Sequence, residues 1–143
     1  MVICKGSLHH IPNVGEALKE IRRALKPGGV LVLSEPCRDN RFWRAIDLAY
    51  IKRSRHFSEV HSPFRSKDLE ALLSANGFTI RATRPFGFLA FPLCGLAYLF
   101  PLMRYMPFNT VLTRWLIRFD ELILKIPLVR DFRWHLVVYA NRV

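Results

Sequence analysis

The stretch Gly28-Gly29-Val30-Leu31-Val32-Leu33-Ser34-Glu35-Pro36 decides the fold. Its unbroken apolar run is typical of a strand covered on both faces, as in a parallel sheet. Before it, residues 14–26 have apolar side chains at helical spacing and follow Asn13, a residue type that caps helices. Residues 1–4 form an earlier apolar segment that predicts a strand. A strand, a helix and a strand joined by short connections make one βαβ unit, so the sequence predicts an α/β fold.

A further helix and two further strands are predicted downstream. Ser66 is a candidate N-cap for a helix that ends at the pair Asn76-Gly77, which favours a left-handed stop. Apolar and polar residues alternate over 78–83, which predicts a strand. Residues 134–140 are rich in β-forming side chains and predict the last strand.

Residues 84–133 are an apolar insertion before the last strand. Residues 85–103 contain no charged side chain, but three prolines interrupt a run that is borderline in length for a membrane span. Residues 110–125 have the pattern of an amphipathic helix. We expect a helical element that acts as a lid over an acceptor or lies on a membrane surface, with a purely structural helical cap as the alternative.

Composition narrows the class of protein. The chain has 143 residues and a formal net charge of +11, and 51 % of its residues are hydrophobic, which excludes a disordered basic tail. Basic residues concentrate in 38–67, where 42–51 favour a helix and 56–63 a loop. Such a stretch attracts phosphate, but a solvated helix face is the favoured explanation.

The cysteine pattern and the first residues indicate the cellular compartment that we expect for the protein. The three cysteines, Cys4, Cys37 and Cys94, are widely spaced and suggest no disulfide framework, so a reducing compartment is expected. The first residues lack the pattern of a signal peptide. We therefore expect a cytoplasmic protein, peripheral to the membrane if its apolar insertion contacts lipid.

Three segments together resemble a known family. They are residues 6–12, with Gly-Ser-Leu-His-His-Ile-Pro, residues 17–29, which end in Lys-Pro-Gly-Gly, and residues 31–36, with Leu-Val-Leu-Ser-Glu-Pro. They resemble the class I S-adenosylmethionine-dependent methyltransferases, in the small-molecule branch with Leu-His-His after the fourth strand. The resemblance is looser over 66–83 and weak at the last strand. It implies an incomplete Rossmann-like parallel sheet, with residues 1–143 forming part of a methyltransferase domain whose cofactor-binding N-terminal half precedes residue 1.

The resemblance also implies roles for individual residues. Gly6, Ser7 and Leu8 would border the methionine part of S-adenosylmethionine, and His9, His10 and Glu35 would face the acceptor. A histidine there can serve as a general base, with packing under the sheet as the alternative. No metal site is expected, because adjacent His9 and His10 should point apart and no carboxylate or cysteine completes a ligand set.

The expected function is S-adenosylmethionine-dependent methyl transfer to a small, hydrophobic or lipid-linked acceptor by the full-length parent. The chain alone, without the main cofactor-binding half, is expected to be inactive. One alternative is a non-catalytic basic membrane-surface protein. Another is a fragment of an RNA methyltransferase, favoured only by net charge, so nucleic acid is not the expected partner.

Overall fold

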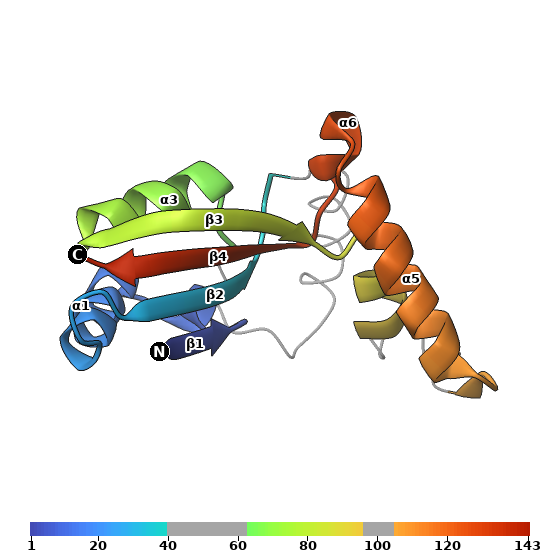
Figure 1. Ribbon diagram of the computed structural model, residues 1–143, viewed down its shortest axis with the longest axis horizontal. Helices are drawn as coiled ribbons and strands as arrows, with labels where there is room; N and C mark the ends of the chain where they lie inside the picture. The colour runs from blue at the N-terminus through green and yellow to red at the C-terminus, as the bar shows by residue number, and fades with distance from the viewer. Residues whose placement is uncertain (40–62, 96–104) are drawn as a thin grey trace.

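Four strands form one open sheet in the computed structural model, which describes residues 1–39, 63–95 and 105–143 (Figure 1). β1 pairs in parallel with β2, whereas β4 lies between β2 and β3 and is antiparallel to both. β1, β2 and β3 therefore share one direction, and their carboxyl ends meet at the same edge. This confirms the incomplete Rossmann-like sheet, with β4 as its reversed strand. The strands are β1 (Val2–Lys5), β2 (Val30–Pro36), β3 (Phe78–Phe86) and β4 (His135–Arg142).

Helices α1 (Val14–Ala24) and α3 (Ser66–Ala75) cover one face of this sheet. The Asn13 side chain accepts a hydrogen bond from the Glu16 backbone N–H at 3.2 Å, which confirms the predicted cap. Every second residue of β2 and β4 is buried against the two helices, as the two-residue repeat of a strand requires. The fully buried leucines among them each contribute roughly 2 kcal/mol of hydrophobic stabilisation. This core consists of Leu8, Leu18, Leu25, Leu31, Leu33, Leu69, Leu73, Phe78, Leu136, Val138 and Ala140.

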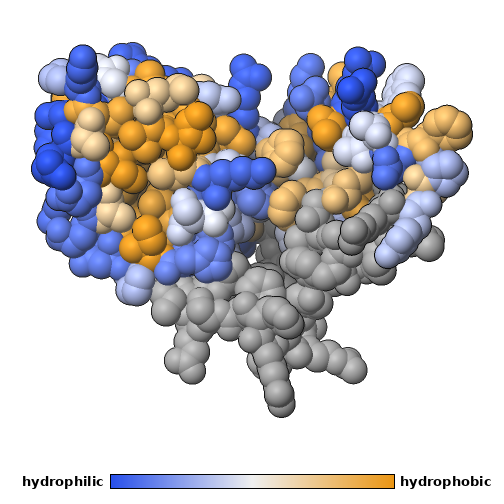
Figure 2. All heavy atoms as spheres, turned by 90° about the horizontal axis from the view of Figure 1, so that it is seen from below, coloured by the Kyte–Doolittle hydropathy of each residue, from blue (hydrophilic) through white to orange (hydrophobic). Residues whose placement is uncertain are grey.

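The opposite face and the β1 edge are open to solvent. Ile3, Val32, Tyr139 and Ala82 pair in register across the four strands on this face. Ile3 is 64 % exposed and Tyr139 39 %. Figure 2, which views the molecule from the β1 side, shows apolar side chains gathered on the sheet half of the molecule. Within the described sheet, β1 has a neighbouring strand on one side only.

The described parts of the connection from β3 to β4 contain helices, as predicted. These are the π-helical turn η2 (Phe91–Gly95), the long helix α5 (Asn109–Ile123) and the short helix α6 (Pro127–Arg130). Figure 1 shows α5 projecting beyond the end of the sheet. None of the helices in the described part of the chain is long and apolar enough to cross a membrane.

Some predicted boundaries differ from those observed. β3 continues to Phe86, so the strand includes Arg84 and Pro85 and the insertion begins later than residue 84. A proline is tolerated there because β3 is an edge strand and needs no ladder donor on its outer side. The helix predicted at 42–51, most of the loop at 56–63 and part of the apolar run at 85–103 lie outside the described residues.

Candidate active site at the carboxyl ends of β1 and β2

The carboxyl ends of β1 and β2 bring most of the predicted site residues together. The chain leaves β1 at Gly6, whose φ of +56° is unfavourable for other residues, and whose N–H donates to the Ser34 carbonyl at 2.7 Å. A 3-10 turn, η1 (Leu8–His10), follows directly. Because Lys5 pairs with Ser34, the next residue of β2, Glu35, lies beside the start of this turn.

Glu35 is a buried carboxylate that holds this turn in place. Its side chain is 0 % exposed. Oε1 accepts from the backbone N–H groups of Ser7 at 3.1 Å and Leu8 at 3.0 Å. Oε2 accepts from the backbone N–H of His9 at 3.4 Å and lies 2.7 Å from His9 Nδ1. Three backbone donors and one imidazole therefore converge on a single side chain.

These contacts keep Glu35 ionised. Burial alone would raise the pKa of its carboxyl group. The hydrogen bonds from the His9 side chain and from the backbone of Leu8 and Ser7 outweigh burial, so the pKa lies below its ordinary value. An ionised Glu35 favours the proton of a neutral His9 ring on Nδ1, which leaves the lone pair on Nε2. This is the tautomer that a general base working through Nε2 requires.

His9 and His10 occupy different environments but do not point apart. His9 is 6 % exposed, whereas His10 is exposed. Their ring centroids are only 3.9 Å apart, so the expectation of divergent rings was wrong. The tight 3-10 turn brings neighbouring side chains together where an extended strand would send them to opposite faces. Within the described ranges, no group of three or more His, Cys, Asp or Glu side chains could hold a metal ion.

A pocket of about 330 Å³ adjoins His9. Its walls come from the segments after β1 and β2 and from residues around the start of α3, and they combine apolar side chains with a histidine, two arginines and one carboxylate. The lining residues are Leu8, His9, Ile11, Pro12, Val14, Arg38, Pro63, Phe64, Arg65 and Asp68. Glu35 does not line the pocket and is connected to it through its contact with His9.

His135, at the start of β4, is close enough to Glu35 and His9 for their charges to affect its pKa. Its ring contacts those of Phe91 and Phe86, with centroids 4.5 and 6.5 Å away. Burial lowers the pKa of His135 to about 4, and the attraction of Glu35 only partly opposes this. His135 is therefore neutral near pH 7, which suits a structural role.

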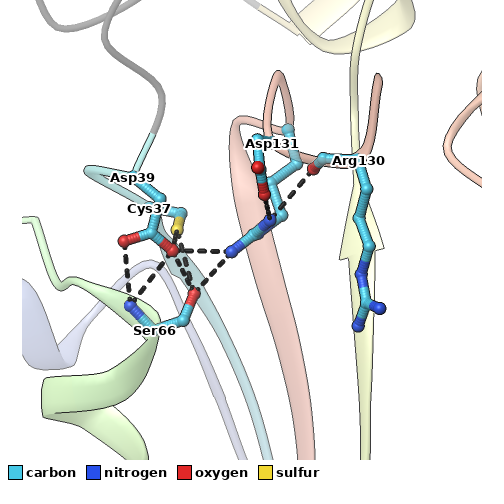
Figure 3. A network of polar contacts seen from close by, with 6 residues as sticks. Cys37, Asp39, Ser66, Arg130 and Asp131 are labelled. Atoms are coloured by element: carbon cyan, nitrogen blue, oxygen red, sulfur yellow. Dashed lines mark hydrogen bonds and ion pairs between the residues drawn. The ribbon is translucent and has the colours of Figure 1, made fainter. Parts of the chain in front are cut away.

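A polar network that the sequence did not reveal lies beside β2 (Figure 3). Arg133 Nη2 donates to Asp39 Oδ2 at 2.6 Å and to Ser66 Oγ at 2.7 Å. Asp39 also accepts from the Ser66 backbone N–H at 3.3 Å, so it caps α3 from another element. The prediction that Ser66 is the N-cap was wrong: Ser66 is the first helical residue and Arg65 precedes it without a side-chain cap. The network joins the end of β2, the start of α3 and the start of β4.

The charges in this network suit a structural role. Burial would raise the pKa of Asp39, but hydrogen bonds from Ser66 and Cys37 and the charge of Arg133 lower it overall. Burial raises the pKa of the Cys37 thiol. A protonated thiol is a poor nucleophile, so the environment of Cys37 does not favour a catalytic role for it.

Asp120 on α5 is a second buried carboxylate that sequence reasoning missed. It is 3 % exposed and accepts from the backbone N–H groups of Phe88, Leu89 and Ala90 at 2.7 to 3.1 Å. Its sequence context is that of an ordinary charged position on an amphipathic helix. Only the tertiary contact shows that it attaches α5 to the segment that follows β3.

Comparison with known proteins identifies the family. A family model described as a methyltransferase domain matches residues 1–83, the segment that holds β1, η1, β2 and Glu35. The chain belongs to the methyltransferase domain family. Its architecture is that of the class I S-adenosylmethionine-dependent enzymes, as the resemblance implied. No curated protein matches the chain.

Solved structures support the methyltransferase fold. A provisionally assigned methyltransferase from Bacillus halodurans C-125 superposes with a TM-score of 0.55 at 20 % identity, covering 98 % of this chain and 63 % of its own. An S-adenosylmethionine-dependent methyltransferase from Mesorhizobium loti gives 0.52 at 15 % identity, covering 99 % and 61 %. Haemonchus contortus phosphoethanolamine N-methyltransferase 2, solved with phosphomonomethylethanolamine and S-adenosylhomocysteine, gives 0.51 at 14 % identity, covering 98 % and 32 %. The chain thus spans less than two thirds of the length of these relatives.

Proposed function

We propose that this chain is the acceptor-side part of an S-adenosylmethionine-dependent methyltransferase that acts on a small, hydrophobic or lipid-linked acceptor. The observation that supports this most directly is the buried pair of Glu35 and His9 at the carboxyl ends of two parallel strands. Ligands of open α/β sheets bind outside the carboxyl ends of the strands. A polar pair held at that edge, beside a pocket, is suited to receive a proton from a bound acceptor.

Residues of the turn after β1 fit the methionine end of the cofactor. A Cβ added at Gly6 would have only His9 Cε1 within 4 Å, at 3.9 Å, so open space adjoins this backbone. Ser7 is exposed and can present its hydroxyl there, whereas the Leu8 side chain is buried in the core. Gly6 and Ser7 would therefore border the cofactor, and Leu8 would contribute by fixing the turn. S-adenosylmethionine, when bound, supplies the electrophilic methyl group.

His9 would act as the base and Glu35 as its positioning residue. An acceptor hydroxyl in the pocket would give its proton to the His9 ring as its oxygen takes the methyl group, and the electron pair of the broken carbon–sulfur bond would remain on the sulfur of the departing cofactor. The imidazolium that results is stabilised by the ionised Glu35 carboxylate 2.7 Å from Nδ1. The three backbone hydrogen bonds to Glu35 hold the pair in one orientation, so little reorganisation is needed during the reaction.

Two features of β1 support the proposal that another half of the domain binds the cofactor and packs against this chain. β1 is an edge strand of the described sheet, and Met1 and Ile3 on it are exposed. An exposed apolar edge is the surface on which a further strand and its helix would pack. We expect the isolated chain not to bind S-adenosylmethionine with micromolar affinity, because one strand end cannot supply about 8 kcal/mol of binding. Titration calorimetry that gave a micromolar Kd would refute this division.

The apolar part of the pocket walls supports an acceptor with an apolar body. Ile11, Val14 and Phe64 offer hydrophobic contact, and the exposed Arg38 and Arg65 offer cationic groups at the same pocket. An acceptor with an apolar body fits this lining, including a prenyl, fatty-acyl or quinone-like compound. A reducing cytoplasmic location, peripheral to a membrane, would bring the protein close to such acceptors.

The test is the pH dependence of methyl transfer in a polypeptide that also carries the cofactor-binding half. Formation of S-adenosylhomocysteine is measured with prenyl, fatty-acyl and quinone-type acceptors, for the parent and for His9→Gln and His10→Gln. We expect His9→Gln to lower kcat by about 10²- to 10⁴-fold and to remove the rise of rate with pH. If His10→Gln lost activity and His9→Gln retained it, the assignment of the base would be overturned. Lys19→Gln, at an exposed position of α1, serves as the control.

A further inference from the structure

We propose that α5 is an interfacial helix that docks on a bilayer surface containing anionic lipid. Val111, Trp115, Phe119 and Leu122 on this helix are all exposed. At 100° per residue they fall within an arc of about 80°, so they form one stripe along the helix. We call these four residues the α5 stripe. The proposal does not depend on methyl transfer.

The α5 stripe is large for a surface that has no partner. Trp115 is 65 % exposed and Leu122 64 %. Phe108 before the helix, and Ile126 and Leu128 after it, are exposed as well. Exposed apolar patches that continue over several helical turns mark interaction surfaces in natural proteins.

The helix is held so that the stripe faces outward. Asp120 lies on the opposite side of the helix and is buried by its hydrogen bonds to the backbone of residues 88–90. Leu124 is also buried. Because these contacts determine the rotation of α5 about its axis, the exposure of the stripe is a consequence of the packing.

The charged residues beside the α5 stripe indicate which class of partner it binds. Arg114 and Arg118 follow one flank of the stripe, at a spacing that places them on the same side of the helix, and the exposed Lys125 lies just after the end of α5. In the described part of the chain, none of these three cations forms an ion pair with a carboxylate. Asp120 is buried and accepts hydrogen bonds from the backbone of residues 88–90, so Glu121 is the only exposed acidic residue within α5. An apolar stripe with tryptophan and phenylalanine, bordered by cations, matches the boundary between acyl chains and anionic headgroups.

The same charges disfavour a second copy of this chain as the occupant. A symmetric dimer built on the stripe buries the same patch of both copies. It would therefore bring Arg114 and Arg118 of both copies to one interface, where their like charges disfavour association. The helix spans 15 residues, about 22 Å, so it is shorter than the hydrocarbon core and would lie in the plane of the surface.

Vesicle co-sedimentation of the chain tests the proposal. The probes are phosphatidylcholine vesicles and phosphatidylcholine–phosphatidylserine vesicles, and the variants are Trp115→Ser/Leu122→Ser and Arg114→Gln/Arg118→Gln. Ile3→Ser is the control for the stripe variant, because Ile3 has the same 64 % exposure as Leu122. Lys67→Gln, at an exposed position of α3, is the control for the charge variant.

The expected results separate the two contributions. The parent should bind the anionic vesicles, and the stripe variant should lose at least about tenfold in affinity for them. The charge variant should lose about fivefold per removed charge on anionic vesicles only, and this loss should disappear at high salt. Both controls should bind as the parent does.

Three results would overturn the proposal. One is no binding of the parent to anionic vesicles, and another is equal binding by the parent and the stripe variant. The third is a dimer in sedimentation equilibrium that the stripe variant abolishes, because it would assign the stripe to a second copy. None of these measurements uses cofactor or acceptor, so failure here leaves the proposed methyl transfer standing.

Discussion

Replacing Glu35 by glutamine tests whether this carboxylate organises the site. The substitution keeps the size of the side chain but removes its charge and replaces one acceptor oxygen with an NH₂ donor. The amide oxygen can still accept from Ser7 and Leu8, as Oε1 does now. The NH₂ group then faces the backbone N–H of His9, so two donors oppose each other in a buried space.

The cost follows from these contacts. A buried N–H left without an acceptor costs about 1–3 kcal/mol, and hydrogen bonds to a charged group contribute about 1.5–3 kcal/mol each. The His9 ring can turn or change tautomer and recover part of its contact with the amide. We therefore expect Glu35→Gln to lower the free energy of unfolding by about 2–4 kcal/mol.

The assay is urea unfolding of the isolated chain, followed by circular dichroism at several pH values. Because the folded-state pKa of Glu35 is depressed, its contribution is present above the unfolded carboxyl value of 4.5 and disappears as the pH falls through the folded value. The parent should therefore lose this part of its stability in acid, and the variant should not. Glu16→Gln, an exposed partner of Lys19 on α1, is the matched control and should change stability by less than about 0.5 kcal/mol.

A specific pair of results would refute the reasoning. If Glu35→Gln unfolds within about 1 kcal/mol of the parent and keeps its acid dependence, then Glu35 neither organises the turn nor is ionised in the folded state. If the Glu16 control shows the same loss, the effect arises from general surface charge. Either result would also remove the structural basis for His9 as an oriented base.

Two further predictions concern other buried groups. Asp120→Asn leaves one of the backbone donors at residues 88–90 facing an NH₂ group, which should lower the free energy of unfolding by about 1–3 kcal/mol. We expect faster hydrogen exchange at those amides and in α5. The control Glu121→Gln should exchange at the same rate as the parent. His135, whose folded-state pKa of about 4 is below its ordinary value of 6.5, should make the chain less stable as the pH falls from 6.5 toward 4. His135→Gln should remove that dependence in urea titrations, and a ring that titrates near 6.5 by NMR would contradict it.

Much of the local structure could be predicted from the sequence, because its causes lie close together in the chain. Asn13 caps α1 by accepting a hydrogen bond from the backbone N–H of Glu16, only three residues later. Gly77 ends α3 with a φ of +76°, which other residues rarely adopt. The apolar run of β2 needs no distant partner to be recognised as a buried strand. The methyltransferase family followed from such segments, since their residue types and spacing lie within 36 residues.

The organisation of the site was decided by tertiary structure alone. Glu35 reaches residues 26 to 28 positions away, Asp120 reaches 30 to 32, and Arg133 reaches Asp39 over 94. Asp120 and Arg133 have the sequence context of ordinary surface charges, and the resemblance marked Glu35 as a site residue without indicating its backbone partners. A charged group becomes buried only where folding supplies enough donors or counter-charges to replace water, and those groups come from distant strands and helices. Periodicity therefore predicts which face of a helix or strand is apolar, but only the packed structure decides which charge the backbone surrounds.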